Sequence, residues 1–417
     1  MSPQTPDRRP SAPDRVPRRR FLAGTAAAAL AAAQVRGRPS VAGEPGPKKY
    51  RVGVIGHTGR GNYGHGLDVV WLEIPGAEIV GVADADPAGL AAAVKRLGGP
   101  KGFADYRKML DEMKPELVSV CPRHLDQHHD MVMAAIESGV RGIYQEKPFC
   151  RTLVEADAIV AACEKHGVKL ALAHQTRYSQ KLPQIWDVIK SGRLGQIVEF
   201  RARGKNDRRG GGEDLWVLGT HMLNLMSHFG GDPQWCFARV WQEGRPVTAA
   251  DVAEGAEGIG PLAGDEVHAM YRLDGGFTGY FDSVRDTGGR PTRFGLSIYG
   301  SEGIIELYNT GHIPTVLYLA DSSWTPGRSG KQWVEITSAG VDRPEPLEDR
   351  GLHGGNVLAV KDLIAAVEEG RQPVSNVYEA RAAVEMIVAV FESHRTGGAV
   401  EFPLKTRENP LSLLGSS

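Results

Sequence analysis

Cysteine is scarce in this sequence, and four cysteines in a chain of 417 residues exclude a disulfide-stabilised scaffold. Charge of one sign is also lacking, because the formal net charge is only −1. The first 40 residues hold eight Arg and two Asp, so the rest of the chain is mildly acidic and a poor match for nucleic acid. Beyond this segment no run of about 18 apolar residues occurs, which excludes a polytopic membrane protein.

The composition is that of a folded protein of more than one domain. Hydrophobic residues make up 41% of the chain and charged residues 24%, which are ordinary globular values. At about 150 residues per domain, the length predicts two or three domains.

The N-terminal segment has the composition of an export signal. The basic block and Phe-Leu pair at Arg18–Leu22 precede an alanine-rich run that reaches Ala33. Such a block, a short apolar core and small residues define a signal peptide, and the paired arginines resemble the twin-arginine motif. Small residues permit cleavage after Ala33 or Ala42. We therefore predict a signal peptide and linker at residues 1–42 and a periplasmic or other extracytoplasmic location; a disordered basic tail is the alternative.

A dinucleotide-binding turn follows the signal. The apolar run Tyr50–Ile55 is typical of a buried parallel strand. It leads into a glycine-rich segment with Thr58 at the position of the middle glycine of a G-x-G-x-x-G fingerprint. We predict that the cofactor-binding residues here are Gly56, Thr58, Gly59, Arg60 and Gly61. The hydroxyl of Thr58 is expected to face a phosphate, and the N-terminus of a following helix is expected to attract the anion.

An acidic residue ends the next predicted strand. Glu78–Ala83 is this strand, and Asp84 follows it. An acid at this place hydrogen-bonds the ribose of NAD and repels the extra phosphate of NADP, so NAD is the predicted cofactor and NADP the alternative. Asp84 is otherwise a helix N-cap, a role for which Asp86 competes. Further predicted strands at 117–120 and 142–144, with a helix at 127–138 between them, favour a doubly wound parallel sheet.

The chain resembles the Gfo/Idh/MocA oxidoreductases, the relatives of glucose–fructose oxidoreductase and inositol dehydrogenase, over nearly all of residues 50–403. The resemblance is carried by the order and spacing of Cys121-Pro122, His128, Glu146-Lys147-Pro148, Arg177-Tyr178, Ser191–Gly195, Gly219-Thr220-His221, Ile298–Gly303 and a late helix from His353. It implies an α/β Rossmann dinucleotide-binding domain, placed at residues 48–172. It also implies an α+β domain with an open, mainly antiparallel sheet, placed at 173–417, which often mediates oligomer contacts.

The sequence after residue 190 agrees with this second domain. It contains strand patterns at 198–203, 236–242, 267–273, 276–283, 294–299 and 304–308. Asp274–Gly276 is a hairpin signal between two of them. Residues 358–369 and 380–392 show helical periodicity.

The resemblance also assigns the chemistry. The family transfers a hydride between a sugar or polyol carbon and nicotinamide, and the hydroxyl proton must then pass to a base near its working pKa. Lys147 matches the family's catalytic lysine and His221 its proton-relay histidine. The bond before Pro148 is expected to be cis. The resemblance assigns further cofactor-side contacts to Pro122, His128, Glu146 and Lys147.

Two family acids are missing. Val217 stands four residues before His221, and Asn224 three residues after it, where dehydrogenases of this family usually carry aspartate. We put forward the hypothesis that Glu213 or Asp214 supplies the lost carboxylate from a shifted loop.

The other predicted substrate contacts are Arg177, Tyr178, Asp214, Trp216 and His221. Trp216 is expected to stack on a sugar face. Packing against the sheet is the alternative for Arg177 and Tyr178, and core packing for Trp216.

The leading prediction is an exported NAD(P)-dependent oxidoreductase that acts on the CH–OH group of a sugar, polyol or glycoside. Because nicotinamide cofactors are not replenished outside the cytoplasm, a tightly bound cofactor and a redox-neutral reaction are expected. The alternatives are an NAD-dependent glycoside hydrolase or epimerase of the family, and a non-catalytic nucleotide-binding relative. The predicted partners are a small carbohydrate or polyol and further copies of the chain in a dimer or tetramer. No metal site is predicted, because His124 and His128 lack completing ligands.

Overall fold

The computed structural model describes residues 49–289, 292–308 and 311–415, so the predicted signal peptide lies outside the described residues. The first part of the described chain forms a six-stranded sheet of order β3-β2-β1-β4-β5-β6. Every neighbouring pair in this sheet is parallel. Its strands are β1 Tyr50–Ile55, β2 Ala77–Ala83, β3 Lys101–Phe103, β4 Leu117–Val120, β5 Gly142–Gln145 and β6 Lys169–Leu172. The predicted doubly wound Rossmann sheet is confirmed.

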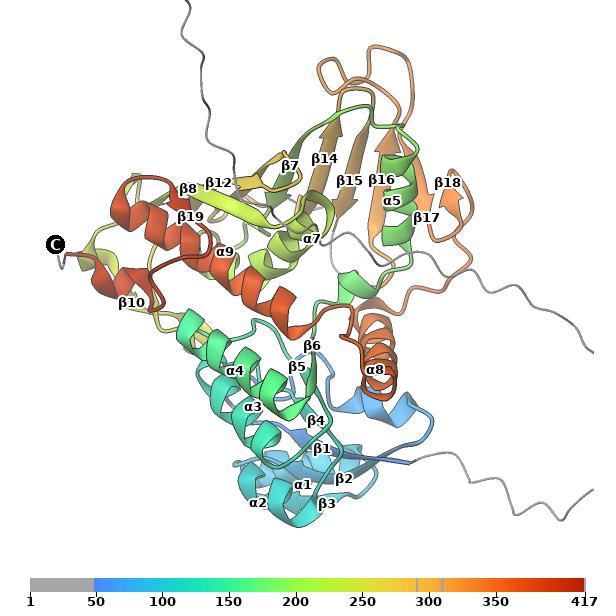
Figure 1. Ribbon diagram of the computed structural model, residues 1–417, viewed down its shortest axis with the longest axis vertical. Coiled ribbons are helices and arrows are strands. Elements are labelled where there is room, and N and C mark those ends of the chain that lie inside the picture. Colours follow the sequence, from blue (N-terminus) through green and yellow to red (C-terminus); the bar gives the residue numbers. More distant parts are fainter. Residues whose placement is uncertain (1–48, 290–291, 309–310, 416–417) are drawn as a thin grey trace, which may run out of the picture. The chain divides into compact units, whose positions relative to one another are not determined.

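Helices cover both faces of this sheet (Figure 1). One apolar core lies under α2 Tyr106–Met113, α3 His128–Glu137 and α4 Leu153–His166. The core on the other face lies under α1 Pro87–Arg96, the 3-10 helix η1 Val69–Glu73 and α8 Gly351–Glu369. Helix α8 therefore returns from the end of the chain to pack on the N-terminal sheet, where it contacts β5, β6 and η1.

No α-helix begins directly after β1 in the described chain, so the expectation of an anion-binding helix N-terminus there is wrong. Residues 58–61 and 63–68 form turns, and the next helical element is the five-residue η1. The glycines of this segment have φ angles of +81°, +88°, +59° and +83° at Gly59, Gly61, Gly64 and Gly66. An α-helix has negative φ throughout, so these four glycines hold the segment in another conformation.

The second sheet has the order β18-β17-β16-β15-β14-β7-β13-β12-β8-β19, and β9 pairs with β8. Only β7 and β13 run parallel; the other neighbouring pairs are antiparallel. The strands are β7 Ile197–Arg203, β8 Pro233–Gln242, β9 Arg245–Pro246, β12 Glu266–Leu273, β13 Thr278–Val284, β14 Gly295–Gly300, β15 Ile304–Tyr308, β16 Thr315–Leu319, β17 Val334–Thr337, β18 Gly340–Val341 and β19 Val400–Glu401. The six predicted strands and the hairpin at Asp274–Gly276 are confirmed. A separate ribbon pairs β10 Ala253–Glu254 with β11 Pro261–Leu262.

Helices pack on one face of this sheet: α5 Lys181–Lys190 on β17, α7 Thr220–Gly230 on β7, and α9 Val377–Thr396 on β8. Figure 1 shows α9 running from the second sheet toward α4 of the Rossmann part. Helix α7 continues a helical segment made of α6 Gly212–Asp214 and the π-helix η4 Leu215–Gly219. This segment carries His221, so it positions one half of the site.

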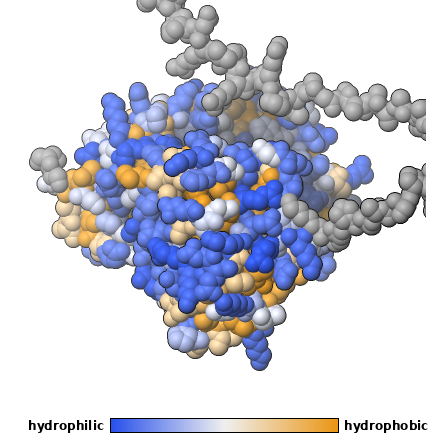
Figure 2. Space-filling model, turned by 60° about the horizontal axis from the view of Figure 1, so that its bottom comes forward, coloured by the Kyte–Doolittle hydropathy of each residue, from blue (hydrophilic) through white to orange (hydrophobic). Residues whose placement is uncertain are grey.

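The described ranges contain no helix that is both long enough and apolar enough to cross a membrane. Figure 2 brings the Rossmann end of the molecule forward and shows hydrophilic residues over most of the displayed face.

Candidate active site

A groove of about 280 Å³ lies where the first strands of the Rossmann sheet end. Its walls follow β1, β2, β3 and β4 and are formed by Gly56, His57, Ala83–Ala85, Ala104–Arg107, Asp126, Gln127, Asp130 and Met131. In open parallel sheets, dinucleotides bind outside the carboxyl ends of the strands, where the strand order reverses. The order 3-2-1-4-5-6 reverses between β1 and β4, so the groove fits a dinucleotide.

Asp84 lies in the wall of this groove, but its carboxylate is already engaged. The main-chain N–H of Thr58 donates to both oxygens (3.0 and 3.1 Å), and the Thr58 hydroxyl donates to Oδ2 (2.7 Å). The Tyr63 hydroxyl and the Asp86 N–H also donate to it (2.9 and 3.0 Å). These donors fill its acceptor sites. The predicted ribose contact by Asp84 and phosphate contact by the Thr58 hydroxyl are therefore not supported; both residues hold the turn together. Asp86 is the N-cap of α1, as its competing role predicted.

The charge of Asp84 still acts on the groove. Burial alone would raise the pKa of this carboxyl, but the hydrogen bonds from Thr58, Asp86 and Tyr63 lower it below its ordinary value. An ionised acid at the end of β2 repels a phosphate on the ribose, which favours NAD over NADP.

The glycine-rich turn lies against the segment after β4. A side chain at Gly61 would collide with the main chain of Arg123 and His124. Gly59 has open space instead, and Arg60 reaches Asp126 in an ion pair. Gly56, Gly59, Arg60 and Gly61 thus build the turn beside the groove as predicted; their contact with a cofactor remains a prediction.

Three residues predicted to contact the cofactor are internal supports. His128 is fully buried and ties two loops together, with Nε2 at 2.6 Å from the Pro122 carbonyl and Nδ1 at 2.8 Å from the Pro148 carbonyl. The Lys147–Pro148 bond is cis, which confirms that prediction. Glu146 is also fully buried and accepts hydrogen bonds from the main-chain N–H groups of His65 and Lys147 (2.9 and 3.0 Å). Neither His128 nor Glu146 is among the lining residues of this groove or of the cavity that Lys147 lines, and both hold loops in place; their contact with a cofactor stays a prediction.

A second cavity, of about 290 Å³, lies where β5, the helical segment 212–230 and the loop after β7 meet. Lys147 and His221 both line it, as predicted, together with His65, Arg123, Gln175, Lys205, Arg209, Val217, Leu218, Glu257, Thr292, Phe294 and Leu352. Only 5% of Lys147 and 4% of His221 is exposed.

The π-helix η4 holds Lys147 through a main-chain carbonyl, at the position where the resemblance implies an aspartate. The Nζ of Lys147 donates to the main-chain carbonyl of Val217 (2.9 Å), which lies within η4. π turns recur at functional sites. Burial lowers the pKa of Lys147, and the cations Arg209 and Arg123 lower it further, although Glu146 and Glu257 oppose this. The amine is thus shifted toward the neutral form that accepts a proton.

His221 is poised beside this lysine. Its Nδ1 is buried and has no hydrogen-bond partner among the described residues. Burial lowers the pKa of His221 well below its ordinary value, and the charge of Lys147 lowers it further. The ring of His174 packs edge-on at 5.2 Å between centroids. Burial and nearby cations lower the pKa of His174 to about 3, so this neighbour is also neutral.

Asp214 and Trp216 are not among the lining residues of this cavity, so the structure does not support their predicted substrate contacts. Asp214 is fully buried and accepts hydrogen bonds from the Ser283 hydroxyl (2.6 Å) and the Asn206 N–H (3.0 Å). It fixes the loop after β7 rather than orienting His221, so the hypothesis that it replaces the lost acid is not supported. Trp216 is 1% exposed and belongs to the apolar core, because η4 turns it away from the cavity.

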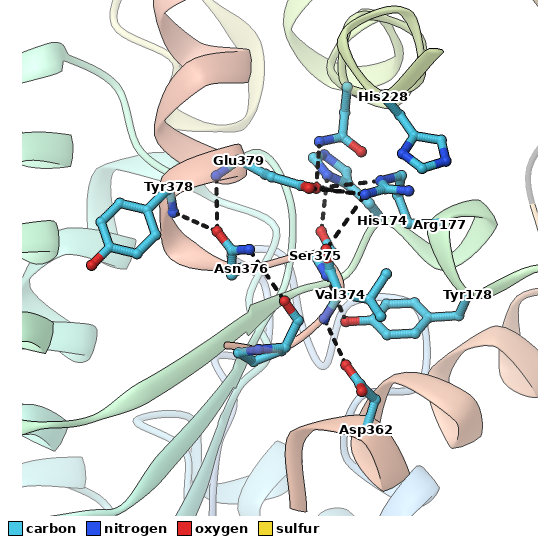
Figure 3. A network of polar contacts seen from close by, with 12 residues as sticks. His174, Arg177, Tyr178, His228, Asp362, Val374, Ser375, Asn376, Tyr378 and Glu379 are labelled. Atoms are coloured by element: carbon cyan, nitrogen blue, oxygen red, sulfur yellow. Dashed lines mark hydrogen bonds and ion pairs between the residues drawn. The ribbon is translucent and has the colours of Figure 1, made fainter. Parts of the chain in front are cut away.

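Arg177 and Tyr178 also lie outside the cavity, so packing is their role (Figure 3). The Arg177 guanidinium donates to both oxygens of Glu379 on α9 (2.9 and 3.1 Å). The Tyr178 hydroxyl accepts from the Ser375 N–H (3.2 Å). Figure 3 shows both residues facing the segment 374–379, so they attach the start of α9 to the segment that follows β6.

Sequence reasoning missed most of the charged lining of the Lys147 cavity. His65 comes from the glycine-rich turn and Arg123 from the loop after β4. Lys205 and Arg209 belong to a basic cluster directly after β7, a signal that was available in the sequence. Glu257 comes from the β10–β11 ribbon, and no pattern in the sequence marks it.

The fold and the two cavities define a two-domain Rossmann protein with its chemical groups at the domain junction. Residues 50–174 match the model of the oxidoreductase family with an NAD-binding Rossmann fold, and residues 183–306 match the Gfo/Idh/MocA C-terminal domain. The chain belongs to the Gfo/Idh/MocA family of oxidoreductases.

Curated relatives include the levoglucosan dehydrogenase of Pseudarthrobacter phenanthrenivorans, 26% identical over 54% of this chain and 63% of that protein. The D-apiose dehydrogenase of Paraburkholderia graminis is 34% identical over 44% of this chain and 51% of that protein. The chain thus spans about half to two thirds of the length of these relatives. The NAD⁺-dependent scyllo-inositol 2-dehydrogenase of Bacillus subtilis is 23% identical over 85% of this chain and 97% of that protein.

Solved structures share the fold. Levoglucosan dehydrogenase in complex with NADH and levoglucosan superposes with a TM-score of 0.67 at 20% identity, over 85% of this chain and all of that one. An oxidoreductase from Agrobacterium radiobacter, in complex with NAD⁺, L-tartaric acid and magnesium, gives 0.63 at 18% identity, over 85% of this chain and 98% of that one.

Proposed function

We propose that this protein is an NAD-dependent dehydrogenase that oxidises a CH–OH group of a sugar or polyol. The observation that carries the proposal is the convergence of Lys147 and His221 in one cavity, with the pKa values of both lowered. The engaged but ionised Asp84 favours NAD over NADP. Relatives named as dehydrogenases of levoglucosan, D-apiose and scyllo-inositol support a carbohydrate substrate.

The chain's own groups supply the proton chemistry. Lys147 in its neutral form accepts the hydroxyl proton, and the Val217 carbonyl fixes its Nζ on the cavity side. The imidazole of His221 lines the same cavity, so the ring can face a second substrate oxygen or the proton in transit. The bound nicotinamide ring supplies the hydride acceptor for the carbinol carbon.

A panel of aldoses, polyols and sugar acids, assayed by the ultraviolet absorbance of NADH for net oxidation and by chromatography of the products for a redox-neutral reaction, tests the proposal. Turnover is expected for at least one compound. It should fall about 10²- to 10⁴-fold in Lys147→Met, the range of general-base contributions, while NADH binding is retained. Lys361→Met, on the exposed side of α8, is the matched control and should be unaffected. A protein that binds NADH but turns over no compound would instead be the non-catalytic relative.

We also propose export with a tightly bound cofactor, because of the predicted twin-arginine signal at Arg18–Leu22. The reaction is then redox-neutral, as in coupled oxidation and reduction, epimerisation or NAD-dependent glycoside cleavage. The variant Arg18→Lys with Arg19→Lys should remain in the cytoplasm in cell fractionation. Mass spectrometry of nucleotide released from washed, denatured exported protein should give one NAD per chain. An empty site would favour an exchangeable cofactor and net oxidation.

We further infer that copies of the chain associate through the open face of the second sheet, as a dimer or tetramer. Light scattering of the purified protein tests this, and a monomer would refute it.

A further inference from the structure

The Lys147 cavity is rich in positive charge. Besides Lys147 itself it is lined by Arg123, Lys205 and Arg209, whereas Glu257 is the one carboxylate among its described lining residues. Arg123 and Arg209 lower the pKa of Lys147, but a neutral sugar offers the lining cations no charge to pair with.

Lys205 and Arg209 pair with an acid, Asp207, that is not among the lining residues of the cavity. Arg123 Nη2 lies 3.6 Å from Glu257 Oε1, and the buried Nε of Arg123 has no partner among the described residues. Arg209 donates to both oxygens of Asp207 (3.1 and 2.7 Å), while Lys205 Nζ is 3.9 Å from the same carboxylate. The charges of Asp214 and Glu213 also act on Arg209, so cations outnumber acids among the residues that line the cavity rather than in the whole neighbourhood.

Asp207 is ionised in this arrangement and balances part of the charge of Arg209 and Lys205. The hydrogen bond from Arg209 lowers the pKa of Asp207 to about 2. The side chains of Lys205 and Arg209 are 45% and 23% exposed, so both still reach solvent and ligand.

The position of the lining cations matters as much as their charge. Lys147 follows β5, Gln175 follows β6, and His221 lies in α7. Lys205 and Arg209 lie instead on the loop after β7. The cavity thus has a part that handles the carbinol proton and a separate basic part. A substrate that fills both has a secondary alcohol and an anionic group within one small molecule.

We infer that the substrate is a sugar acid, a uronate or aldonate, whose carboxylate binds Arg209 and Lys205 while one of its hydroxyl groups faces Lys147. Because nearby acids already balance part of the charge of Lys205 and Arg209, a singly charged carboxylate matches these cations better than a doubly charged phosphate. The inference rests on the proposed dehydrogenase function, whose site it specifies.

Paired ligands test this inference. Calorimetry on the NADH-loaded protein compares D-glucuronate with D-glucose, D-galacturonate with D-galactose, and D-mannuronate with D-mannose. At least one acid should bind about tenfold or more tighter than its aldose, as expected for a charge-assisted hydrogen bond. The preference should weaken as salt is raised.

Substitutions at two adjacent arginines test which residue causes the preference for the acid over the aldose. Arg209→Gln should abolish the preference by weakening the acid alone, whereas Arg208→Gln, an exposed arginine outside the cavity, should retain it. Equal affinity for acids and aldoses, equal weakening of both by Arg209→Gln, or no binding of any pair would overturn the inference. Tighter binding of D-glucose 6-phosphate than of every uronate would overturn the choice of carboxylate. Failure to bind NADH would instead count against the proposed function, and the acid–aldose comparison on nucleotide-free protein would still decide the inference.

Discussion

Two glycines of the turn after β1 make a matched pair for mutation. Gly59 and Gly61 both have positive φ, +81° and +88°, so alanine at either position strains the backbone. A Cβ at Gly59 meets nothing within 4 Å. A Cβ at Gly61 lies 2.8 Å from the His124 nitrogen and still closer to that of Arg123, although real Cβ atoms stay beyond about 3.0 Å. The difference in unfolding free energy between Gly59→Ala and Gly61→Ala therefore measures the effect of the collision alone.

The expected costs follow from these contacts. Gly59→Ala should lower the free energy of unfolding by about 1–2 kcal/mol, the strain of an L-residue in a left-handed conformation. Gly61→Ala adds an overlap with main chain, for which about 1–3 kcal/mol is typical, so its total loss should be about 2–5 kcal/mol. The segment that must move carries Arg123 and Asp126, which line the two cavities.

Urea unfolding and NADH titration measure both effects. NADH affinity should fall clearly more in Gly61→Ala than in Gly59→Ala, because only the former displaces the segment after β4. Equal losses of stability and affinity in the two variants would refute the argument, since backbone strain alone would then account for both.

Three further predictions follow from charged groups. Arg177→Met should cost about 2–4 kcal/mol in urea unfolding, because it strips a buried cation from Glu379, and should leave the KM for substrate unchanged. Arg123→Gln removes a cation that lowers the pKa of Lys147, so the pH–rate profile of turnover should shift to higher pH. His268→Gln should destabilise the protein at pH 6 but not at pH 10. The hydrogen bond to Asp282 raises the pKa of His268 from 6.5 to about 9, so its stabilisation is complete below pH 6.5 and lost as pH rises through 9. Because 42% of the His268 side chain is exposed, the expected loss in the free energy of unfolding is on the order of 1 kcal/mol. Urea unfolding at both pH values measures it.

The elements that could be predicted from the sequence are those with a local signal. The parallel strands are short apolar runs, and the strands of the second sheet alternate in polarity. The prediction of a helix after Gly61 was wrong because η1 and α8 occupy that place on the sheet. Helix α8 comes about 290 residues later in the chain. No pattern within residues 56–83 contains that information.

Only part of the site could be predicted, because here too the local sequence does not contain the contacts between distant residues. Lys147 and His221 could be named because they sit in motifs. Arg177 was misplaced because its partner, Glu379, lies 202 residues away, and residue type does not say whether an arginine faces ligand or protein. Trp216 was misplaced because the π-helix sets which side chains face the cavity, and a π turn has no sequence signature.

Val217 connects these observations. The resemblance implies an aspartate at its position, whose negative charge would stabilise the protonated form of Lys147. The main-chain carbonyl of Val217 holds the same amine with a dipole instead of a charge, so it positions the lysine without that effect. The cations Arg123 and Arg209 act in the same direction and lower the pKa of Lys147 further. A lysine that takes up a proton in such surroundings gains from a nearby negative charge, and a carboxylate on the substrate would supply the charge that the chain itself no longer carries.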